Sequence, residues 1–123
     1  MSTFESFRRA EELLAERRPL EALRELQPVL DDAPDKPSVH LLAGRAYLGS
    51  AQLLRAEAAF RRVLEIDPSD HYARFALGRT LQRQGRLTEA HAQLRMAATM
   101  HPIPEYQEAL GEVSAKIALQ KDA

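Results

Sequence analysis

Apolar side chains recur every three or four residues along nearly the whole chain, and no stretch alternates between apolar and polar residues as a strand does. This period predicts amphipathic α-helices that each bury one face. Proline, glycine and aspartate separate the apolar runs, which indicates short connections between the helices. The predicted helices cover residues 4–17, 19–32, 37–48, 53–66, 71–84, 87–100 and 105–120.

Several helix ends carry their own sequence signals. Ser2 followed by Glu5 fits a capping box, in which the serine side chain accepts a backbone N–H of the first turn. Asp70 is placed to cap the helix that begins at residue 71. Gly85 is expected to end that helix in the left-handed conformation. The segment from residue 101 to 104 contains two prolines, which stop the sixth helix.

The chain repeats itself every 34 residues. Two small residues and one proline return at this interval in each of three segments. The recurring residues are Ala10, Gly44 and Gly78; Ala22, Ala56 and Ala90; and Pro34, Pro68 and Pro102. A period of this length is typical of stacked helical hairpins, in which each repeat contacts only its neighbours.

With repeats numbered from residues 3, 37 and 71, the chain resembles the tetratricopeptide repeat family, whose 34-residue pattern contains an aromatic, Leu-Gly, Tyr, Ala, Phe and Pro. The third repeat matches at Leu77, Gly78, Leu81, Gly85, Ala90, Leu94, Ala97 and Pro102. The second matches at Gly44, Tyr47, Ala56, Phe60, Val63 and Pro68, and the first at Ala10, Leu13, Ala22, Leu26, Val29 and Pro34. The aromatic expected at the fourth position is replaced by Ser6, His40 and Arg74.

The resemblance implies an all-α fold, a right-handed superhelix (α-solenoid) of three helix–turn–helix repeats plus a C-terminal capping helix. It implies a single domain over residues 1–123, with repeats at about 3–36, 37–70 and 71–104 and the capping helix at about 105–120. The recurring small residues would let paired helices approach closely. We expect the last helix to cover the final repeat with Tyr106, Leu110, Val113 and Ile117.

Composition and charge exclude some classes of protein. The formal net charge of the 123 residues is −1, which gives no argument for binding nucleic acid or membranes. Residues 37–104 carry nine basic and five acidic side chains, whereas the segments on either side are acidic. The chain contains no cysteine, so disulfides and thiol chemistry are excluded. No apolar run resembles a signal peptide or a membrane span, and we expect a cytoplasmic protein.

The resemblance also implies where a partner binds. Stacked hairpins form a concave groove that is lined by the first helix of each repeat, and in the family this groove grips an extended peptide or a partner helix. The residues that the resemblance places in the groove are Phe7, Glu11, Leu14, Leu41, Arg45, Leu48, Tyr72, Phe75, Arg79 and Gln82, with Arg83 at its rim. We expect a partner segment of acidic and apolar character, because guanidinium groups bind carboxylates and rings pack against apolar side chains.

Two of these arginines allow opposite interpretations. Arg45 and Arg79 occupy the same position in successive repeats and should lie side by side across the groove. Alternatively they pair with Glu11 or with acids of the last helix, while Tyr72 and Phe75 serve as half-buried packing residues. The family's known clamp of Lys and Asn residues for a C-terminal carboxylate is missing, since Phe7 and Glu11 occupy its first-repeat positions.

Nothing in the sequence predicts an enzyme. The chain has no Gly-rich phosphate loop, no nucleophile elbow and no HExxH motif. The four histidines, at positions 40, 71, 91 and 101, are not spaced from one another or from carboxylates as metal ligands are, so we expect no metal or other cofactor. Pairs such as Arg8-Arg9 and Arg61-Arg62 are flanked by acids and predict surface ion pairs rather than a nucleic-acid site.

The sequence therefore predicts an adaptor or scaffold that binds a peptide or protein in a concave groove. The alternative is a self-associating assembly subunit, a homodimer formed through the terminal helices. Phe4 and Phe7, at the uncapped first repeat, would then supply the apolar contact.

Overall fold

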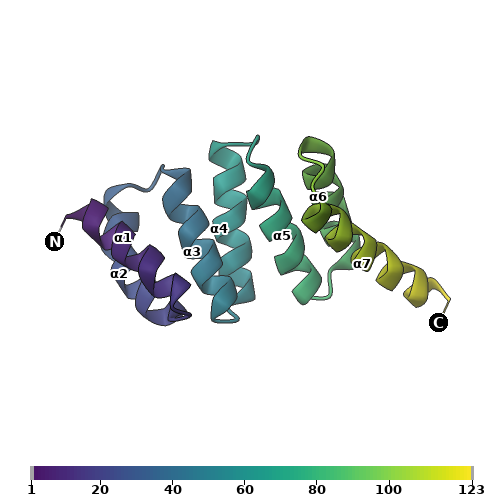
Figure 1. Cartoon of the computed structure of the whole chain (residues 1–123), viewed down its shortest axis with the longest axis horizontal. Coiled ribbons are helices and arrows are strands. Elements are labelled where there is room, and N and C mark those ends of the chain that lie inside the picture. Colours follow the sequence, from purple (N-terminus) through teal and green to yellow (C-terminus); the bar gives the residue numbers. More distant parts are fainter. Residues whose placement is uncertain (1, 123) are drawn as a thin grey trace. The chain divides into compact units, whose positions relative to one another are not determined.

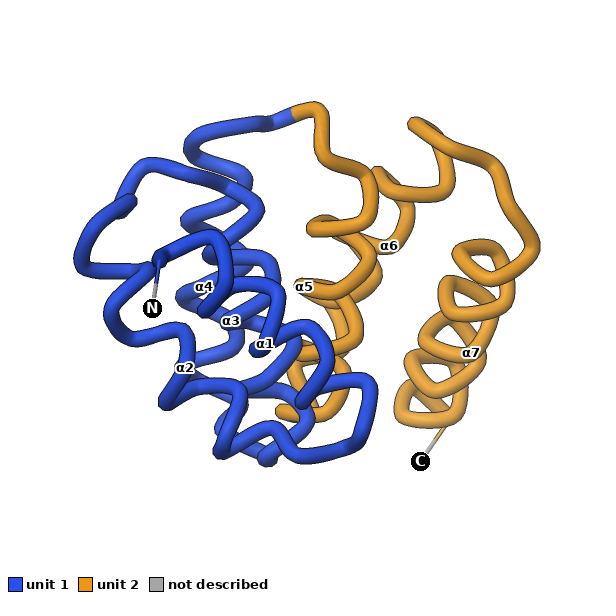
Figure 2. The backbone as a smooth tube through the Cα atoms, turned by 60° about the vertical axis from the view of Figure 1, so that its left-hand side comes forward, with its two compact units in different colours: residues 1–68 blue, residues 69–123 orange. Residues whose placement is uncertain are grey.

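The computed structural model describes residues 2–122, and the regular elements in this range are all α-helices. The helices are α1 (Thr3–Ala15), α2 (Pro19–Asp32), α3 (Pro37–Gly49), α4 (Leu53–Ile66), α5 (His71–Arg83), α6 (Leu87–Met100) and α7 (Pro104–Lys121) (Figure 1). The chain divides into two compact units, residues 1–68 and residues 69–123 (Figure 2). Residues 2–122 contain no helix with both the length and the apolar character needed to cross a membrane.

Residues 1–68 form two helical hairpins, α1–α2 and α3–α4. Helix α3 packs on both α2 and α1, so α1 and α3 are neighbours within this unit. The core of this packing is made of the apolar stripes predicted from the sequence, and it includes Ala10, Leu13, Ala22, Leu26, Val29, Val39, Leu42, Ala43 and Ala46. Phe4 lies outside this core, because its side chain is 69% exposed at the start of α1.

As predicted, small residues allow the paired helices to approach each other closely. A β-carbon on Gly44 would lie 2.6 Å from a ring carbon of Phe60, and one on Gly78 would lie 2.7 Å from the side chain of Leu94. Real β-carbons do not approach other atoms so closely, so a β-carbon at either position would force the facing side chain to shift. In the α1–α2 hairpin the same position is the fully buried Ala10, which already carries a β-carbon.

Residues 69–123 form the α5–α6 hairpin, with α7 packed on α6 and α5. Helix α7 buries Tyr106, Ala109 and Val113, whereas Leu110 and Ile117 are only half-buried. The prediction that α7 covers the last hairpin is confirmed, but its stripe runs through Ala109 rather than Leu110.

The predicted caps are confirmed. The Ser2 hydroxyl accepts the N–H of Glu5 at 3.2 Å, and Asp70 accepts the N–H of Ala73 at 2.9 Å. Gly85 has φ of 77°, the left-handed conformation expected after a helix. The same turn in the other two hairpins uses Arg17 and Ala51, whose φ angles are 61° and 58°. Helix α1 therefore ends at Ala15, two residues earlier than predicted, because Arg17 already forms the turn.

Candidate functional site

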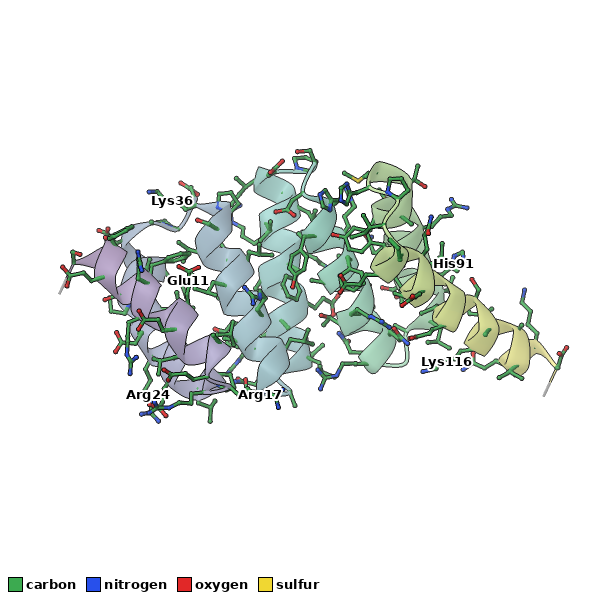
Figure 3. All side chains as sticks on the ribbon, in the orientation of Figure 1. Glu11, Arg17, Arg24, Lys36, His91 and Lys116 are labelled. Carbon is green, nitrogen blue, oxygen red and sulfur yellow. The ribbon has the colours of Figure 1, made fainter. Side chains whose placement is uncertain are left out.

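In residues 1–68 the predicted groove residues lie on two neighbouring helices. Helix α1 carries the half-buried Phe7 and the exposed Glu11, and α3 carries the exposed Arg45 between the half-buried Leu41 and Leu48. Because side chains four apart share one face of a helix, these positions form a polar centre with apolar side chains on either side. Figure 3 shows Glu11 extending from α1 on the side where α3 runs.

Arg45 has no acidic partner. Neither it nor Glu11 forms an ion pair or a side-chain hydrogen bond with any other part of residues 2–122. The alternative interpretation, in which Glu11 neutralises Arg45, is therefore wrong for this residue. Arg45 offers an exposed guanidinium that can bind a carboxylate from outside the chain.

In residues 69–123 the predicted groove residues lie on α5, and their surroundings differ from those of the groove residues in residues 1–68. Tyr72 is 37% exposed, Arg83 is exposed, and Arg79 and Gln82 are half-buried. Phe75, which we expected as an exposed groove aromatic, is only 8% exposed. Phe75 is therefore mainly a packing residue, as the alternative interpretation proposed.

Arg79 is already paired, in contrast to Arg45. Its Nη1 donates to Glu112 of α7 at 2.7 Å and to Gln82 at 2.9 Å, while its guanidinium lies 5.6 Å from the centre of the Phe75 ring. The hydrogen bond from Arg79 lowers the pKa of Glu112. Arg79 thus pairs with an acid of the last helix, which confirms the alternative interpretation at this position.

Tyr106 of α7 is the centre of an aromatic cluster. Its ring stacks on Phe75 with centroids 4.7 Å apart and planes inclined by 21°, and the centroids of the Tyr72 and Phe75 rings lie 6.2 Å apart. The phenol oxygen of Tyr106 and Nδ1 of His71 form a hydrogen bond of 2.8 Å. Burial raises the pKa of the Tyr106 phenol, so its hydroxyl keeps its proton at neutral pH.

Two histidines complete this cluster. The rings of His71 and His101 stack with centroids 4.1 Å apart. Sequence spacing missed this pair, because one residue begins α5 and the other ends α6. The signal was available only from the hairpin, which brings the start of its first helix close to the end of its second. In residues 2–122 no three His, Cys, Asp or Glu side chains gather as metal ligands do.

The predicted pairing of the two arginines across a groove stays a prediction. Arg45 lies in residues 1–68 and Arg79 lies in residues 69–123, the two compact units described above. Of these two arginines, Arg79 forms an ion pair with Glu112 and Arg45 forms none within residues 2–122.

A pocket of about 430 Å³ opens within residues 1–68, where the start of α1, the end of α2 and the start of α3 meet. We call it the α1–α2–α3 pocket. Buried valines and two exposed charged side chains, Asp32 and Lys36, are among the residues that line it. Its lining consists of Thr3, Phe4, Phe7, Val29, Asp32, Ala33, Lys36, Ser38 and Val39. Lys36 extends from the loop between α2 and α3 (Figure 3).

Comparison with known proteins agrees with the repeat pattern. The sequence model of the tetratricopeptide repeat family matches residues 7–71, 41–103 and 75–116. No curated protein matches the sequence.

Solved structures of tetratricopeptide repeat domains share the fold at low sequence identity. The Sgt2 domain from Aspergillus fumigatus is 16% identical with a TM-score of 0.91, over 98% of this chain and 82% of that one. The first such domain of Spaghetti (RPAP3), bound to the HSP90 peptide SRMEEVD, is 17% identical with a TM-score of 0.89, over 94% of this chain and 93% of that one. MamA is 13% identical with a TM-score of 0.90, over 98% of this chain and 71% of that one.

These matches confirm the all-α solenoid class that the 34-residue period predicted. The family matches overlap and together extend from residue 7 to residue 116, which is most of the chain. The chain belongs to the tetratricopeptide repeat family.

Proposed function

We propose that this protein is an adaptor that binds a segment of a partner protein along the first helices of its repeats. The observation that carries the proposal is Arg45, an exposed guanidinium without an acidic partner, held between half-buried leucines on α3. A charged group placed among apolar side chains suits a partner that brings a carboxylate and apolar side chains together.

The partner chemistry follows from this arrangement. A carboxylate of the partner accepts hydrogen bonds from Arg45, and neighbouring apolar side chains pack on Phe7, Leu41 and Leu48. Glu11 repels a second acid on the α1 side, and it thereby sets the direction of the bound segment. We propose that the protein acts in the cytoplasm and that it binds its partner without catalysing a reaction.

Residues 69–123 contribute less charge to the proposed surface. Tyr72 and Arg83 are exposed and Gln82 is half-buried, whereas Phe75 is buried and Arg79 is paired with Glu112. A partner carboxylate that reaches Arg79 must share this guanidinium with Glu112. We therefore assign Arg45 the larger role.

Solved structures of similar domains support peptide binding, but they do not identify the ligand of this chain. The Spaghetti (RPAP3) domain carries an HSP90 peptide in its solved structure. This chain has Phe7 and Glu11 where the family's carboxylate clamp begins, so we propose an internal acidic and apolar segment rather than a chaperone C-terminus.

A second candidate is self-association. It is favoured by Phe4, a large apolar side chain that is 69% exposed at the start of α1. Sedimentation of the purified chain over a range of concentrations separates the two candidates. A monomer at every concentration removes this one.

Selection of peptides from a random library on the immobilised protein tests the main proposal. We expect the selected peptides to combine Asp or Glu with apolar residues, and we expect Arg45→Glu to weaken their binding at least tenfold. Arg24→Glu, the same charge reversal on an exposed residue of α2, is the matched control and should leave binding unchanged. Equal binding by wild type and Arg45→Glu would remove Arg45 from the site and overturn the proposal.

A further inference from the structure

The α1–α2–α3 pocket has a counterpart within the same chain. The hairpin and following helix of residues 69–123, α5, α6 and α7, repeat the arrangement of α1, α2 and α3. His71 begins α5 as Thr3 begins α1, and His101 follows α6 as Ala33 follows α2. This correspondence allows the two corners to be compared residue by residue.

The third helix fixes the register at the corner. Pro37 begins α3 and Pro104 begins α7, so Val39 and Tyr106 are both the third residue of their helix. Burial agrees, since Val39, Leu42 and Ala46 are buried in α3 and the residues at the same distances from the start of α7 are also buried. The connection of residues 101–103 is one residue shorter than residues 33–36, so this match is offset by 67 residues rather than 68.

The two corners therefore differ at three equivalent positions. Each position has a large side chain in residues 69–123 and a small one in residues 1–68. His71, His101 and Tyr106 fill the corner of residues 69–123 with stacked and hydrogen-bonded rings. Thr3, Ala33 and Val39 stand at the equivalent positions and line the pocket of about 430 Å³. The pocket lies where the imidazole and phenol rings lie in the other corner.

Two aromatic residues of the Tyr106 cluster have aromatic counterparts in residues 1–68, although Tyr106 itself has none. Phe7 corresponds to Phe75, on which Tyr106 stacks, and Phe4 corresponds to Tyr72. Both phenylalanines line the pocket. A ring that enters the pocket can therefore stack on Phe7 as Tyr106 stacks on Phe75. Thr3, at the position equivalent to His71, lines the pocket and carries a hydroxyl that can hydrogen-bond with a phenol.

We propose that the α1–α2–α3 pocket binds a tyrosine side chain of a partner protein, in the place that Tyr106 takes in residues 69–123. This inference rests on the proposed function, because the ring belongs to the segment that Arg45 holds. Lys36 at the edge of the pocket forms no ion pair in residues 2–122, so a partner acid beside the tyrosine would bind there.

The probe is p-cresol, which is the tyrosine side chain alone, titrated into the full ¹⁵N-labelled chain and followed by NMR. We expect saturable shifts of the amides of Phe7, Lys36 and Val39, with a dissociation constant of about 1 mM because the ring is small. The matched probe 4-methylcyclohexanol has the same size without the aromatic ring, and it should bind at least fivefold more weakly. Equal binding of the two compounds would overturn the aromatic assignment.

Val39→Tyr supplies the ring from within the chain, and Val39→Ile is its matched control. We expect Val39→Tyr to abolish p-cresol binding while Val39→Ile retains it, with the amide spectrum of residues 69–123 unchanged in both. Phe4→Ser tests the wall without disturbing the core, because Phe4 is mostly exposed, and it should weaken p-cresol binding at least threefold. Unchanged p-cresol binding by folded Val39→Tyr or by Phe4→Ser would overturn the proposal.

The two proposals fail in distinguishable ways. If p-cresol does not bind while the selected peptides still depend on Arg45, the pocket is wrong and the proposed function stands. If p-cresol binds and the library yields no peptide, the adaptor function fails, and with it the partner tyrosine. If the wild type is a dimer that Val39→Tyr dissociates, the occupant is a second copy and the assignment to another protein is overturned.

Discussion

The corner of α1, α2 and α3 and the corner of α5, α6 and α7 share a backbone arrangement but differ in what fills them. Tyr106 is 2% exposed in one corner, whereas Val39 at the same position leaves the α1–α2–α3 pocket open. A repeat fixes where side chains can meet, and a few side-chain volumes decide whether the place is closed or available to a ligand. The difference separates a corner that stabilises from one that can bind.

The difference also follows from the helices that pack on α3 and on α7. Helix α7 covers the hairpin before it, and a large aromatic such as Tyr106 buries more apolar surface there than an aliphatic residue would. Within residues 2–122, helix α3 packs on α1, α2 and α4, whereas α7 packs on α5 and α6. Helix α3 therefore has less need of a large anchor, and Val39 suffices. Stability therefore favours the tyrosine in α7, and the smaller residue in α3 leaves room for a ring from outside.

The largest expected effect comes from removing the ring that fills its corner. Tyr106→Ala should lower the free energy of unfolding of residues 69–123 by about 3–5 kcal/mol, because a buried aromatic is lost and a cavity remains. Val39→Ala should have a smaller effect, about 1–2 kcal/mol, because only two methyl groups are lost beside an existing pocket. Hydrogen exchange read amide by amide measures both. A larger loss for Val39→Ala would contradict the comparison.

Much of the fold could be predicted from the sequence. The 34-residue period indicated the hairpins, and the caps at Ser2, Asp70 and Gly85 needed only local rules that the structure confirms. The apolar stripe along each helix also predicted which face of that helix is buried. These features depend on neighbours within about four residues or on an exact repeat, and both are visible in a sequence.

The candidate site could be predicted only in part. The placement of Arg45 on an exposed face followed from its repeat position, but its lack of a partner did not. The stacking of His71 on His101 and the pairing of Arg79 with Glu112 depend on how α6 and α7 connect. That connection is one residue shorter than its counterpart, which shifts the register of α7 and is lost when a strict 34-residue period is applied.

The comparison extends into the hairpins that carry the two corners. Gly78 faces Leu94 in α5–α6, while Ala10 stands at the same repeat position in α1–α2. Gly78→Ala should lower stability by about 1–3 kcal/mol through overpacking against Leu94. Ala10→Gly should also lower it, by about 1–2 kcal/mol, but through helix propensity and the loss of a buried methyl group.

Urea unfolding of both variants measures these losses, and a double variant shows whether they are independent. Crystal structures of the variants would distinguish the two causes, because only Gly78→Ala should displace the opposite helix. A Gly78→Ala variant as stable as the wild type would mean that Leu94 adjusts without strain. The packing of α5 against α6 would then not depend on a glycine at position 78.

The turns inside the hairpins provide a smaller test. Arg17 and Ala51 adopt the left-handed conformation that Gly85 adopts in the third hairpin. A β-carbon is unfavourable in this conformation. Ala51→Gly and Arg17→Gly should therefore each raise the melting temperature and increase the free energy of unfolding by about 1 kcal/mol. Gly85→Ala should lower it by a similar amount. Calorimetry measures all three, and opposite signs at equivalent turns are the expected result.

The smallest expected effect is electrostatic and depends on pH. Arg79 lowers the pKa of Glu112, so the folded chain binds a proton at this carboxyl less readily than the unfolded chain does. The ion pair therefore contributes stability above the ordinary pKa of a glutamate, and this contribution is lost as the pH falls through the lowered pKa. Glu112→Gln should be less stable than the wild type at pH 7, and the difference should shrink toward zero in acid.

Urea unfolding at pH 7 and at pH 3 measures this difference, and Glu108→Gln is the matched control, an exposed glutamate on the same helix. A difference that persists unchanged in acid would show that Glu112 acts through packing rather than charge. The result also bears on binding. If Glu112→Gln frees Arg79 at little loss of stability, it should strengthen binding of acidic peptides to residues 69–123, because the Arg79 guanidinium becomes available to their carboxylates. Unchanged peptide affinity would leave Arg79 a structural residue, and the two units would then differ in their arginines as they differ in their corners.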